Sequence, residues 1–538
     1  MRLELYLQFE KEKITMIEDV SLRVSPKIAA LRPLLKQRVA GELHINESEI
    51  NDLRIVRRSI DARQRNVAVN LTVRVALDDD PEVKPVYEPV KFYPVSDGAP
   101  CIVIVGAGPA GLFAALKAIE LGIRPVLLER GSDVDSRRVE LAKISREGTV
   151  DPDSNYCFGE GGAGAYSDGK LFTRSKKRGN VDSILQLLHQ HGASADILVD
   201  AHPHIGSDKL PDVIKNIRKT IINCGGEVRF REKVTDLIIE NGKAIGVETA
   251  SGEKIFGAVV LSTGHSARDV YRFLFKDKVD IEAKGLAIGV RLEHPQELID
   301  SLQYHSKEGR GQYLPAAEYS YVTQVDGRGV YSFCMCPGGV IVPAMSAPGQ
   351  SVVNGMSASA RASQWANSGM VVELHPGDIP GFEKEGALEM LALQEFLERR
   401  FFEESGKTLN APAQRMTDFV NGKDSKDLPK SSYPAGIHPA RLDHLLPKEI
   451  SGRLKDGFKS FNRKCPGFLT PEATMIGLES RTSSPVRIPR DRESLMHVTI
   501  EDLYPAGEGA GYAGGIVSAA IDGQRCVEAY HSKINANR

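Results

Sequence analysis

The sequence has little cysteine, almost no tryptophan, no excess charge of either sign and no long unbroken apolar run. Its 7 cysteines, an odd number in 538 residues, do not suit a disulfide framework, so we expect a reducing, cytoplasmic setting. The 69 basic and 71 acidic residues nearly cancel, which removes the electrostatic case for nucleic-acid binding. The uncharged stretches 98–116 and 330–360 are interrupted by glycine and proline and predict no membrane span.

What remains is the composition of an ordinary globular protein, with 41% hydrophobic and 26% charged residues. The first residues alternate charged and apolar side chains and lack the apolar core of a signal peptide. Glycine is enriched, at 50 residues, and many of these glycines stand in tight clusters. Clustered glycines are typical of backbone that approaches a ligand closely, so they give the first indication of function.

The N-terminal part predicts a small α/β unit. Apolar residues alternate over 3–9 and again over 67–77, and a helical pattern covers 26–42 between them. This order predicts a βαββ arrangement, which ends in the acidic, proline-rich segment 78–89. We therefore expect a first domain over 1–95.

Residues 101–131 have the order strand, glycine turn, helix and strand, with the spacing Gly106-x-Gly108-x-x-Gly111 at the turn. The first glycine permits the turn, the second lets a diphosphate approach the backbone, and Gly111 lets the helix pack on the strand. Free N–H groups at the helix start would bind the diphosphate. Glu129 ends the second strand, where its carboxylate can accept from ribose hydroxyls, which favours FAD or NAD over NADP.

Residues 503–524 repeat the pattern of strand, glycine turn and helix start, with Glu508 in the turn and Gly514-Gly515 before the helix. This segment resembles the C-terminal flavin motif of the large glutathione-reductase-like FAD proteins. The resemblance implies that Glu508 binds the ribityl and phosphate region and that N–H groups near Gly515 and Ile516 face the flavin ring. Most such families have an aspartate in this motif. With a glutamate at this position, the motif resembles that of the geranylgeranyl-reductase-like branch.

A third glycine-rich segment, 158–174, suggests backbone lying against a flat ligand. Together with the sequences at 262–269 and 479–491, it resembles the uncharacterised FAD-dependent dehydrogenases, which are single long chains with a small N-terminal α/β domain. The resemblance covers nearly the whole chain. It implies a redox flavoprotein but does not identify the substrate. The expected cofactor contacts are Gly106, Gly108, Pro109, Ala110, Gly111, Glu129, Arg130, Gly161, Gly162, Gly164, Lys170, Thr263, Gly264, Gly507, Glu508, Gly514, Gly515 and Ile516.

Residues for substrate chemistry are less clearly marked. His204 could donate a proton and Lys209 could stabilise negative charge; the alternative is a helix entry after Pro211, capped by Ser207 or Asp208. We expect His204, Lys209 and Arg481 as the catalytic candidates.

Arg481 and Arg487 could anchor a substrate carboxylate, or they are solvated loop arginines. Cys334 and Cys336 could form a redox pair, but residues two apart on a strand face opposite ways, which favours a core role. No His and Cys spacing predicts a metal site. The arginine-rich run 57–65 is expected to be a solvated face rather than an anion site.

The sequence thus predicts an α/β protein with a discontinuous Rossmann-type FAD domain (96–280 and 470–538), an inserted mixed α/β substrate domain (281–469) and the N-terminal domain. The expected function is an FAD-dependent oxidoreductase that transfers a hydride between flavin N5 and a small organic substrate. Alternatives are a flavin monooxygenase, or a non-catalytic flavin-binding protein whose N-terminal domain recruits a partner. The electron donor or acceptor stays open.

Overall fold

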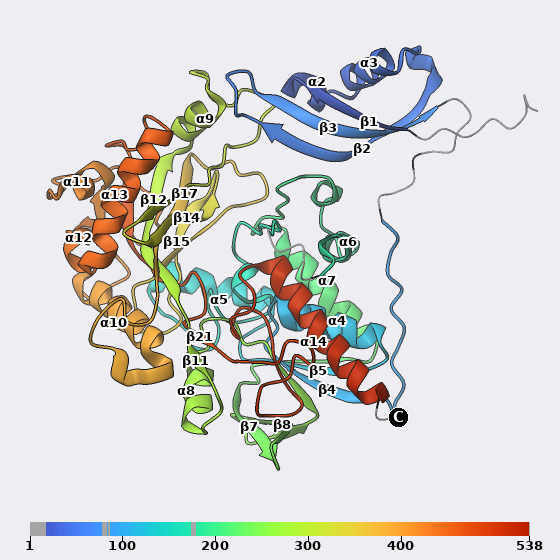
Figure 1. Cartoon of the computed structure of the whole chain (residues 1–538), viewed down its shortest axis with the longest axis vertical. Helices are drawn as coiled ribbons and strands as arrows, with labels where there is room; N and C mark the ends of the chain where they lie inside the picture. The colour runs from blue at the N-terminus through green and yellow to red at the C-terminus, as the bar shows by residue number, and fades with distance from the viewer. Residues whose placement is uncertain (1–17, 78–82, 84–86, 174–178, 537–538) are drawn as a thin grey trace, which may run out of the picture.

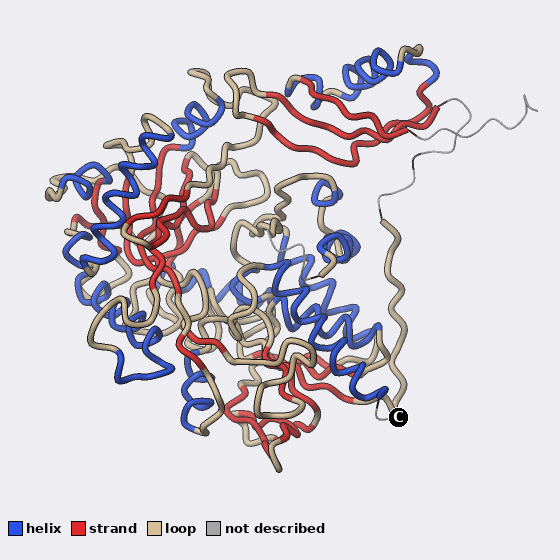
Figure 2. The backbone as a smooth tube through the Cα atoms, in the orientation of Figure 1, coloured by secondary structure: helices blue, strands red, loops and turns tan. Residues whose placement is uncertain are grey.

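A computed structural model describes residues 18–77, 83, 87–173 and 179–536. The strand expected over 3–9 lies outside these residues. Within them, four sheets have three or more strands, and two smaller antiparallel pairs, β11–β21 and β15–β16, accompany them (Figures 1 and 2).

The N-terminal unit is an antiparallel sheet in the order β1-β3-β2, with two helices on one face (Figure 1). Apolar residues on β1 and β3 alternate inward and pack beneath the helices. The elements are β1 (Glu18–Val24), α2 (Pro26–Ala30), α3 (Arg32–Leu43), β2 (Ile50–Asp61) and β3 (Ala68–Leu77). The helix expected over 26–42 and the strand expected over 67–77 are confirmed.

Arg57, Arg63 and Arg65 are exposed, as expected for a solvated face, whereas Arg58 attaches this unit to the body of the protein. Arg58 of β2 donates Nε–H to Asp200 at 2.6 Å and Nη2–H to Asp196 at 2.9 Å. Its backbone N–H also donates to the carbonyl of Val199 at 2.8 Å. Arg63 pairs with Asp61 inside its own unit. These ion pairs satisfy the two arginines without an external anion.

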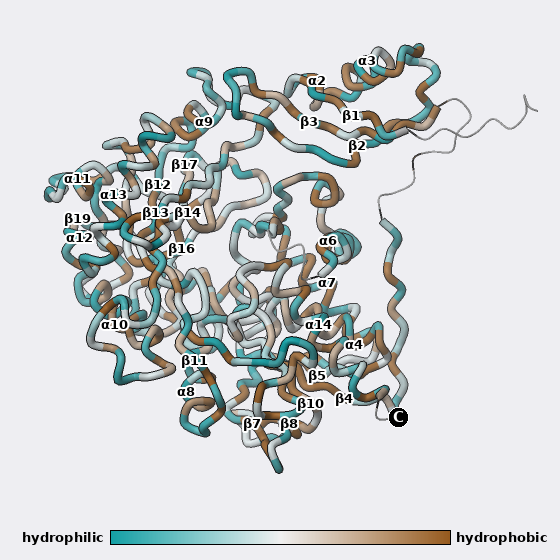
Figure 3. Tube along the Cα trace, in the orientation of Figure 1, coloured by the Kyte–Doolittle hydropathy of each residue, from teal (hydrophilic) through white to brown (hydrophobic). Residues whose placement is uncertain are grey.

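The centre of the fold is a parallel sheet in the order β22-β10-β4-β5-β6. Its strands are β4 (Cys101–Val105), β5 (Arg124–Glu129), β6 (Glu227–Phe230), β10 (Ala258–Leu261) and β22 (Leu503–Pro505). The strand β4 is apolar along its length, as expected for a strand covered on both faces (Figure 3). Because β4 and β22 lie either side of β10, the two glycine motifs meet at one edge of the sheet.

Helices cover this parallel sheet. The C-terminal helix α14 (Ile516–Ala536) lies alongside α4 (Pro109–Glu120), as Figure 1 shows. A Cβ on Gly523 of α14 would lie 2.0 Å from the carbonyl oxygen of Ala110, so the absence of a side chain permits this close approach. The other helices near the sheet are α5 (Val134–Glu147), α6 (Val181–Gln190), α7 (Leu210–Asn223) and α8 (Arg268–Lys276).

Between β6 and β10 the chain forms the three-stranded meander that the two hairpin signals predict. Its strands are β7 (Val234–Glu240), β8 (Lys243–Thr249) and β9 (Lys254–Phe256). Asn241 and Gly242, both at positive φ, form the first turn, and Gly252 lies in the second.

The largest sheet has seven strands in the order β13-β14-β17-β12-β20-β18-β19 and is mostly antiparallel. The strands are β12 (Leu286–Pro295), β13 (Val322–Val325), β14 (Arg328–Cys336), β17 (Trp365–Leu374), β18 (Ala411–Arg415), β19 (Ile437–Pro439) and β20 (Thr474–Glu479). Its helices are α9 (Gln296–Tyr304), α10 (Glu389–Glu404), α11 (Met416–Asn421), α12 (Leu442–Leu445) and α13 (Lys448–Lys464). The smaller pairs are β11 (Glu282–Ala283) with β21 (Val486–Arg487), and β15 (Val340–Pro343) with β16 (Val353–Met356).

The parallel sheet and the seven-stranded sheet each have a separate apolar core. The mixed α/β class and the parallel sheet expected from the sequence are confirmed. Among the described residues, no helix has both the length and the apolar character that crossing a membrane requires.

Candidate functional site

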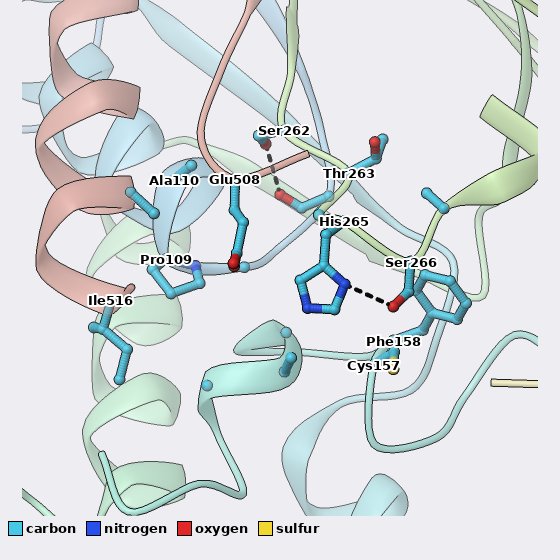
Figure 4. Close-up of a pocket in the computed structure, with 18 of the residues that line it drawn as sticks. Pro109, Ala110, Cys157, Phe158, Ser262, Thr263, His265, Ser266, Glu508 and Ile516 are labelled. Atoms are coloured by element: carbon cyan, nitrogen blue, oxygen red, sulfur yellow. Dashed lines mark hydrogen bonds between the residues drawn. The ribbon is translucent and has the colours of Figure 1, made fainter. Parts of the chain in front are cut away.

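A cavity of about 350 Å³ lies between the parallel sheet and the seven-stranded sheet. It is lined by the ends of β4, β5 and β10, the starts of α4 and α14, the glycine-rich segment 158–170, and residues of β14 and β16. Its position at the carboxyl ends of parallel strands is where open α/β sheets bind ligands. Segments far apart in the sequence therefore share one site (Figure 4).

The turn between β4 and α4 has the glycine geometry that the motif predicts. Gly106 has φ +99°, and a Cβ there would lie 2.6 Å from the carbonyl oxygen of Ser262. A Cβ on Gly111 would lie 1.9 Å from the oxygen of Gly106, so this glycine packs the helix on the turn and does not line the cavity. Gly108 lines the cavity and faces open space. No side chain caps α4, which leaves its first-turn N–H groups available to an anion.

Glu129 lies at the end of β5, and its carboxylate organises this edge of the sheet. It accepts from the N–H groups of Ala107 at 2.8 Å, Gly131 at 2.9 Å and Gly159 at 2.9 Å. It also lines the cavity. Neighbouring Arg130 lies over the Phe158 ring, 4.3 Å from its centroid. Glu129 therefore supports the glycine turn as well as facing the cavity, a structural duty that spacing alone did not reveal.

The start of α14 and the turn before it form the opposite end of this wall. Gly514 and Gly515 line the cavity, and neither would bring a Cβ within 4 Å of another atom. Glu508 points into the cavity (Figure 4). No hydrogen bond to its carboxylate occurs within the described residues, and burial, against the attraction of Lys284, raises its pKa to about 8. Gly507 instead packs against Ala110 and does not line the cavity.

The glycine-rich segment passes beneath both helix starts. Gly162 and Gly164 line the cavity, as do Thr263 and Gly264 after β10. Gly161 does not: a Cβ there would lie 2.4 Å from Ile214, so it is required for packing and not for ligand contact. The expected role of Gly161 as a cofactor contact is corrected for this reason.

His265 is a cavity residue that the sequence analysis missed. Its Nδ1 lies 2.9 Å from Ser266 Oγ, and Arg481 donates Nη1–H to that same oxygen at 3.2 Å. Arg481 and His265 therefore meet at the Ser266 hydroxyl, which holds the imidazole through Nδ1. Burial, with the charges of Arg481 and Arg268, lowers the pKa of His265 to about 4. The imidazole is therefore neutral near pH 7, and it faces the cavity (Figure 4).

Arg481 lies on the cavity wall but does not serve as the expected substrate anchor. Its Nη1 donates to Ser346 at 2.7 Å and its Nη2 to Gln350 at 2.7 Å. Nε–H and Nη2–H also donate to the buried carboxylate of Glu398, each at 3.2 Å. With its donors already paired, the guanidinium has none left for a substrate carboxylate. The arginine instead fixes Ser266 and His265.

The other two catalytic candidates lie off the cavity wall. His204 bonds through Nε2 to the carbonyl of Ser359 at 3.2 Å. Lys209 is exposed at the start of α7, where Pro211 occupies the first turn, so the helix-entry alternative describes this segment. Asp208 does not cap that helix; it accepts from the N–H of Ser359 at 2.6 Å.

Arg487 is likewise absent from the cavity lining: it is exposed and lies over the Tyr512 ring, 5.7 Å from its centroid. Of the two interpretations of Arg487, the solvated arginine therefore describes this residue, and the substrate anchor does not.

The seven-stranded sheet contributes Cys334 to the cavity. A register shift between Phe333 and Cys336 bulges β14, and Cys334 has φ +45°. The bulge breaks the alternation on which the sequence argument depended, and the Cys336 thiol donates back to the carbonyl oxygen of Cys334 at 3.4 Å. Lys170, also on the cavity wall, donates to the carbonyl of Met335 in the bulge and to Asp168 at 3.2 Å.

Comparison with known proteins places the chain in a family. Residues 285–482 match a family described as "FAD-dependent protein, C-terminal domain-like", and residues 16–76 match a domain of unknown function. An uncharacterised protein of Clostridium beijerinckii is 39% identical over 520 residues, which cover 92% of this chain and 95% of that protein. The chain belongs to this family of FAD-dependent proteins, and its cofactor is FAD.

Solved structures show a more distant likeness. A geranylgeranyl bacteriochlorophyll reductase-like protein from Thermoplasma acidophilum is 12% identical, with a TM-score of 0.34, over 82% of this chain and 80% of that chain. A flavin-dependent brominase is also 12% identical, with a TM-score of 0.36, over 81% of each chain.

The cavity fits FAD on the chemistry of its lining. Open glycines and the uncapped start of α4 suit a diphosphate, and the unpartnered carboxylate of Glu508 suits a ligand that donates from hydroxyl groups.

Proposed function

We propose that this protein is an FAD-dependent oxidoreductase whose cofactor occupies the cavity between the parallel sheet and the seven-stranded sheet. When bound, FAD supplies hydride transfer. The observation that carries the proposal is that two glycine-rich helix starts, those of α4 and α14, line one cavity together with an unpartnered carboxylate, and that no side chain caps α4.

In this proposal the chain binds and orients the cofactor through backbone more than through side chains. The N–H groups of the α4 first turn hold the diphosphate, and Gly108 leaves the space that this approach requires. Glu129 keeps the turn in place and accepts from ribose hydroxyls. Glu508 accepts from the ribityl chain, and the α14 start places positive N–H groups at the far end of the site.

His265, held through Nδ1 by Ser266, would hydrogen-bond through Nε2 to the cofactor or the substrate. Lys170 adds a positive charge near the side of the cavity formed by Cys334. In the same proposal, the FAD domain is discontinuous and the substrate domain is inserted into it. The substrate would enter the cavity beside the seven-stranded sheet.

Filling the cavity without straining the backbone tests the binding part. Gly108 has φ −75°, which valine tolerates, and a Cβ there is 3.9 Å from its nearest neighbour, in Gly162. We expect Gly108→Val to keep the melting temperature of the cofactor-free protein and to lose bound FAD, measured by flavin absorbance after desalting. Gly98→Val, at an exposed open position, is the control. Wild-type protein that is colourless and refuses added FAD would overturn the proposal.

Reaction class needs a second measurement. We expect the photoreduced protein to reoxidise slowly in air and to be bleached by one member of a metabolite panel, as for a dehydrogenase. Substrate-dependent oxygen consumption driven by NAD(P)H would favour the monooxygenase instead. Failure to pass electrons to any acceptor, with FAD bound, would leave a binding protein.

A further inference from the structure

We propose that Cys334 and Cys336 form a redox-active dithiol at the cavity wall, which closes to a disulfide as two electrons pass to the bound flavin. This inference rests on the proposed function, because FAD is the electron acceptor. It assigns chemistry to the segment that alternation along a strand had placed in the core.

The backbone at Cys334 is strained. Its φ of +45° lies in the left-handed region that favours glycine, and such strain persists where surrounding contacts impose it. Two cations impose it here: Arg291 donates to the carbonyl of Cys334 at 2.7 Å, and Lys170 donates to the carbonyl of Met335. The strained residue is thus held in place, and its side chain lines the cofactor cavity.

The two cysteine side chains lie next to each other in the bulge. The Cys336 thiol donates to the carbonyl oxygen of Cys334 at 3.4 Å, and its sulfur lies 3.3 Å from Arg291 Nη2. The neighbouring Cys336 side chain, aided by the charges of Arg291 and Lys170 against the cost of burial, holds the pKa of Cys334 below its usual value. The neighbouring Cys334 side chain and burial raise the pKa of Cys336. One thiolate beside one thiol is the arrangement from which a disulfide forms.

The step balances as follows. With Cys334 as the thiolate and Cys336 as the thiol, one S–S bond forms and the S–H bond of Cys336 breaks. The two electrons released reduce the flavin, and the flavin takes up one proton, equal to the one released by Cys336. In the reverse direction, flavin reduced by the substrate of the proposed oxidoreductase would return two electrons and a proton to the disulfide and regenerate the dithiol.

Thiol mapping tests the pair independently of FAD. Cofactor-free protein is equilibrated with oxidised and reduced glutathione, alkylated and digested. We expect the peptide spanning 334 and 336 to lose both alkylation sites and to be two hydrogens lighter, while Cys465 stays alkylated. Alkylation of both cysteines, or mixed disulfides with glutathione alone, across the whole redox range would overturn the dithiol.

Anaerobic reductive titration tests the link to FAD. We expect wild-type holoenzyme to take up twice the reducing equivalents per FAD that Cys334→Gly takes up. Glycine suits the positive φ, so this variant keeps the fold, and circular dichroism with retained FAD verifies that. Cys465→Ser should titrate as wild type. Equal uptake by wild type and Cys334→Gly would overturn the electron transfer, whereas absence of FAD binding would sink the proposed function and leave the thiol map standing.

Discussion

The cavity has two walls that are built in different ways. The backbone wall, formed by Gly108, Gly264, Gly514 and Gly515, presents open glycines and helix starts. The side-chain wall, formed by Phe333, Cys334, Asn354 and Arg481, presents a strained bulge and a buried ionic network. Backbone suits a cofactor with a fixed phosphate geometry, whereas side chains suit a partner whose chemistry differs from one enzyme to another.

The largest expected effect comes from breaking the network behind the side-chain wall. Glu398 is fully buried and accepts from Arg268 at 2.8 Å and Ser480 at 2.7 Å in addition to Arg481. Against the effect of burial, the two arginines lower the pKa of Glu398 to about 2. Glu398→Ala removes the buried carboxylate that both arginines share, so we expect a loss of about 3–5 kcal/mol of unfolding free energy in urea titration.

Glu404→Ala, an exposed change on the same helix, is the control for that prediction and should cost less than about 0.5 kcal/mol. Equal losses in the two variants would show that Glu398 carries no network.

The second effect breaks the backbone wall from behind. A Cβ on Gly523 would collide with the backbone of Ala110, so Gly523→Ala should cost about 1–3 kcal/mol and release FAD more readily. The matched control is Gly452→Ala within α13, where a Cβ meets nothing within 4 Å. That change should stabilise the protein by about 0.5–1 kcal/mol, since alanine favours helix. A shared sign for the two variants would contradict the close contact of α14 with α4.

A third prediction concerns Glu508, the carboxylate on the backbone wall. Its pKa in the cofactor-free protein is raised to about 8, so the folded protein retains a proton that the unfolded chain releases above about pH 4.5. The stability that this group contributes is fully present below about pH 4.5 and is lost as the pH rises from there through 8. We expect the unfolding free energy of cofactor-free protein to fall by about 1–3 kcal/mol between these two pH values.

Urea titrations from pH 5 to pH 9 measure that fall, and Glu508→Gln should flatten it because the amide cannot ionise. A wild-type profile parallel to that of Glu508→Gln would contradict the raised pKa.

The smallest effect lies outside both walls. Arg58 and Asp200 are each about one third exposed, at 34% and 30%, so Arg58→Ala should cost only about 0.5–1 kcal/mol and leave FAD content unchanged. The loss should shrink in high salt. Arg65→Ala, at an exposed position in the same arginine-rich run, is the control, and limited proteolysis near residue 90 reports loosening of the N-terminal unit. Loss of FAD in Arg58→Ala would tie that unit to the site.

The backbone wall could be predicted from sequence because its determinants are local. The spacing of Gly106, Gly108 and Gly111 encodes a turn and a helix start within a few residues, and the second motif does the same. The side-chain wall and the network behind it could not be predicted. The network joins Arg481 to His265, Ser266 and Glu398, which come from distant segments of the chain. Arg481 was singled out but misassigned, since nothing local shows that its donors are already occupied.

Local rules also failed where the backbone is irregular. The inference that Cys334 and Cys336 face opposite ways assumed a regular strand, and the bulge at Phe333 removes that assumption. His204 and Lys209 are polar residues in a loop, for which turn and helix-entry roles compete with chemistry on equal terms. The contact with Ser359, from a segment far along the chain, decided between them.

The contact of Gly523 with Ala110 has a consequence for how a cell makes this protein. The helix α14 is made long after α4, yet it supports the first glycine turn. A ribosome-bound chain that has exposed 101–131 but not 516–536 lacks one end of the proposed FAD site. Until α14 is made, other contacts or chaperones must protect the apolar face of α4.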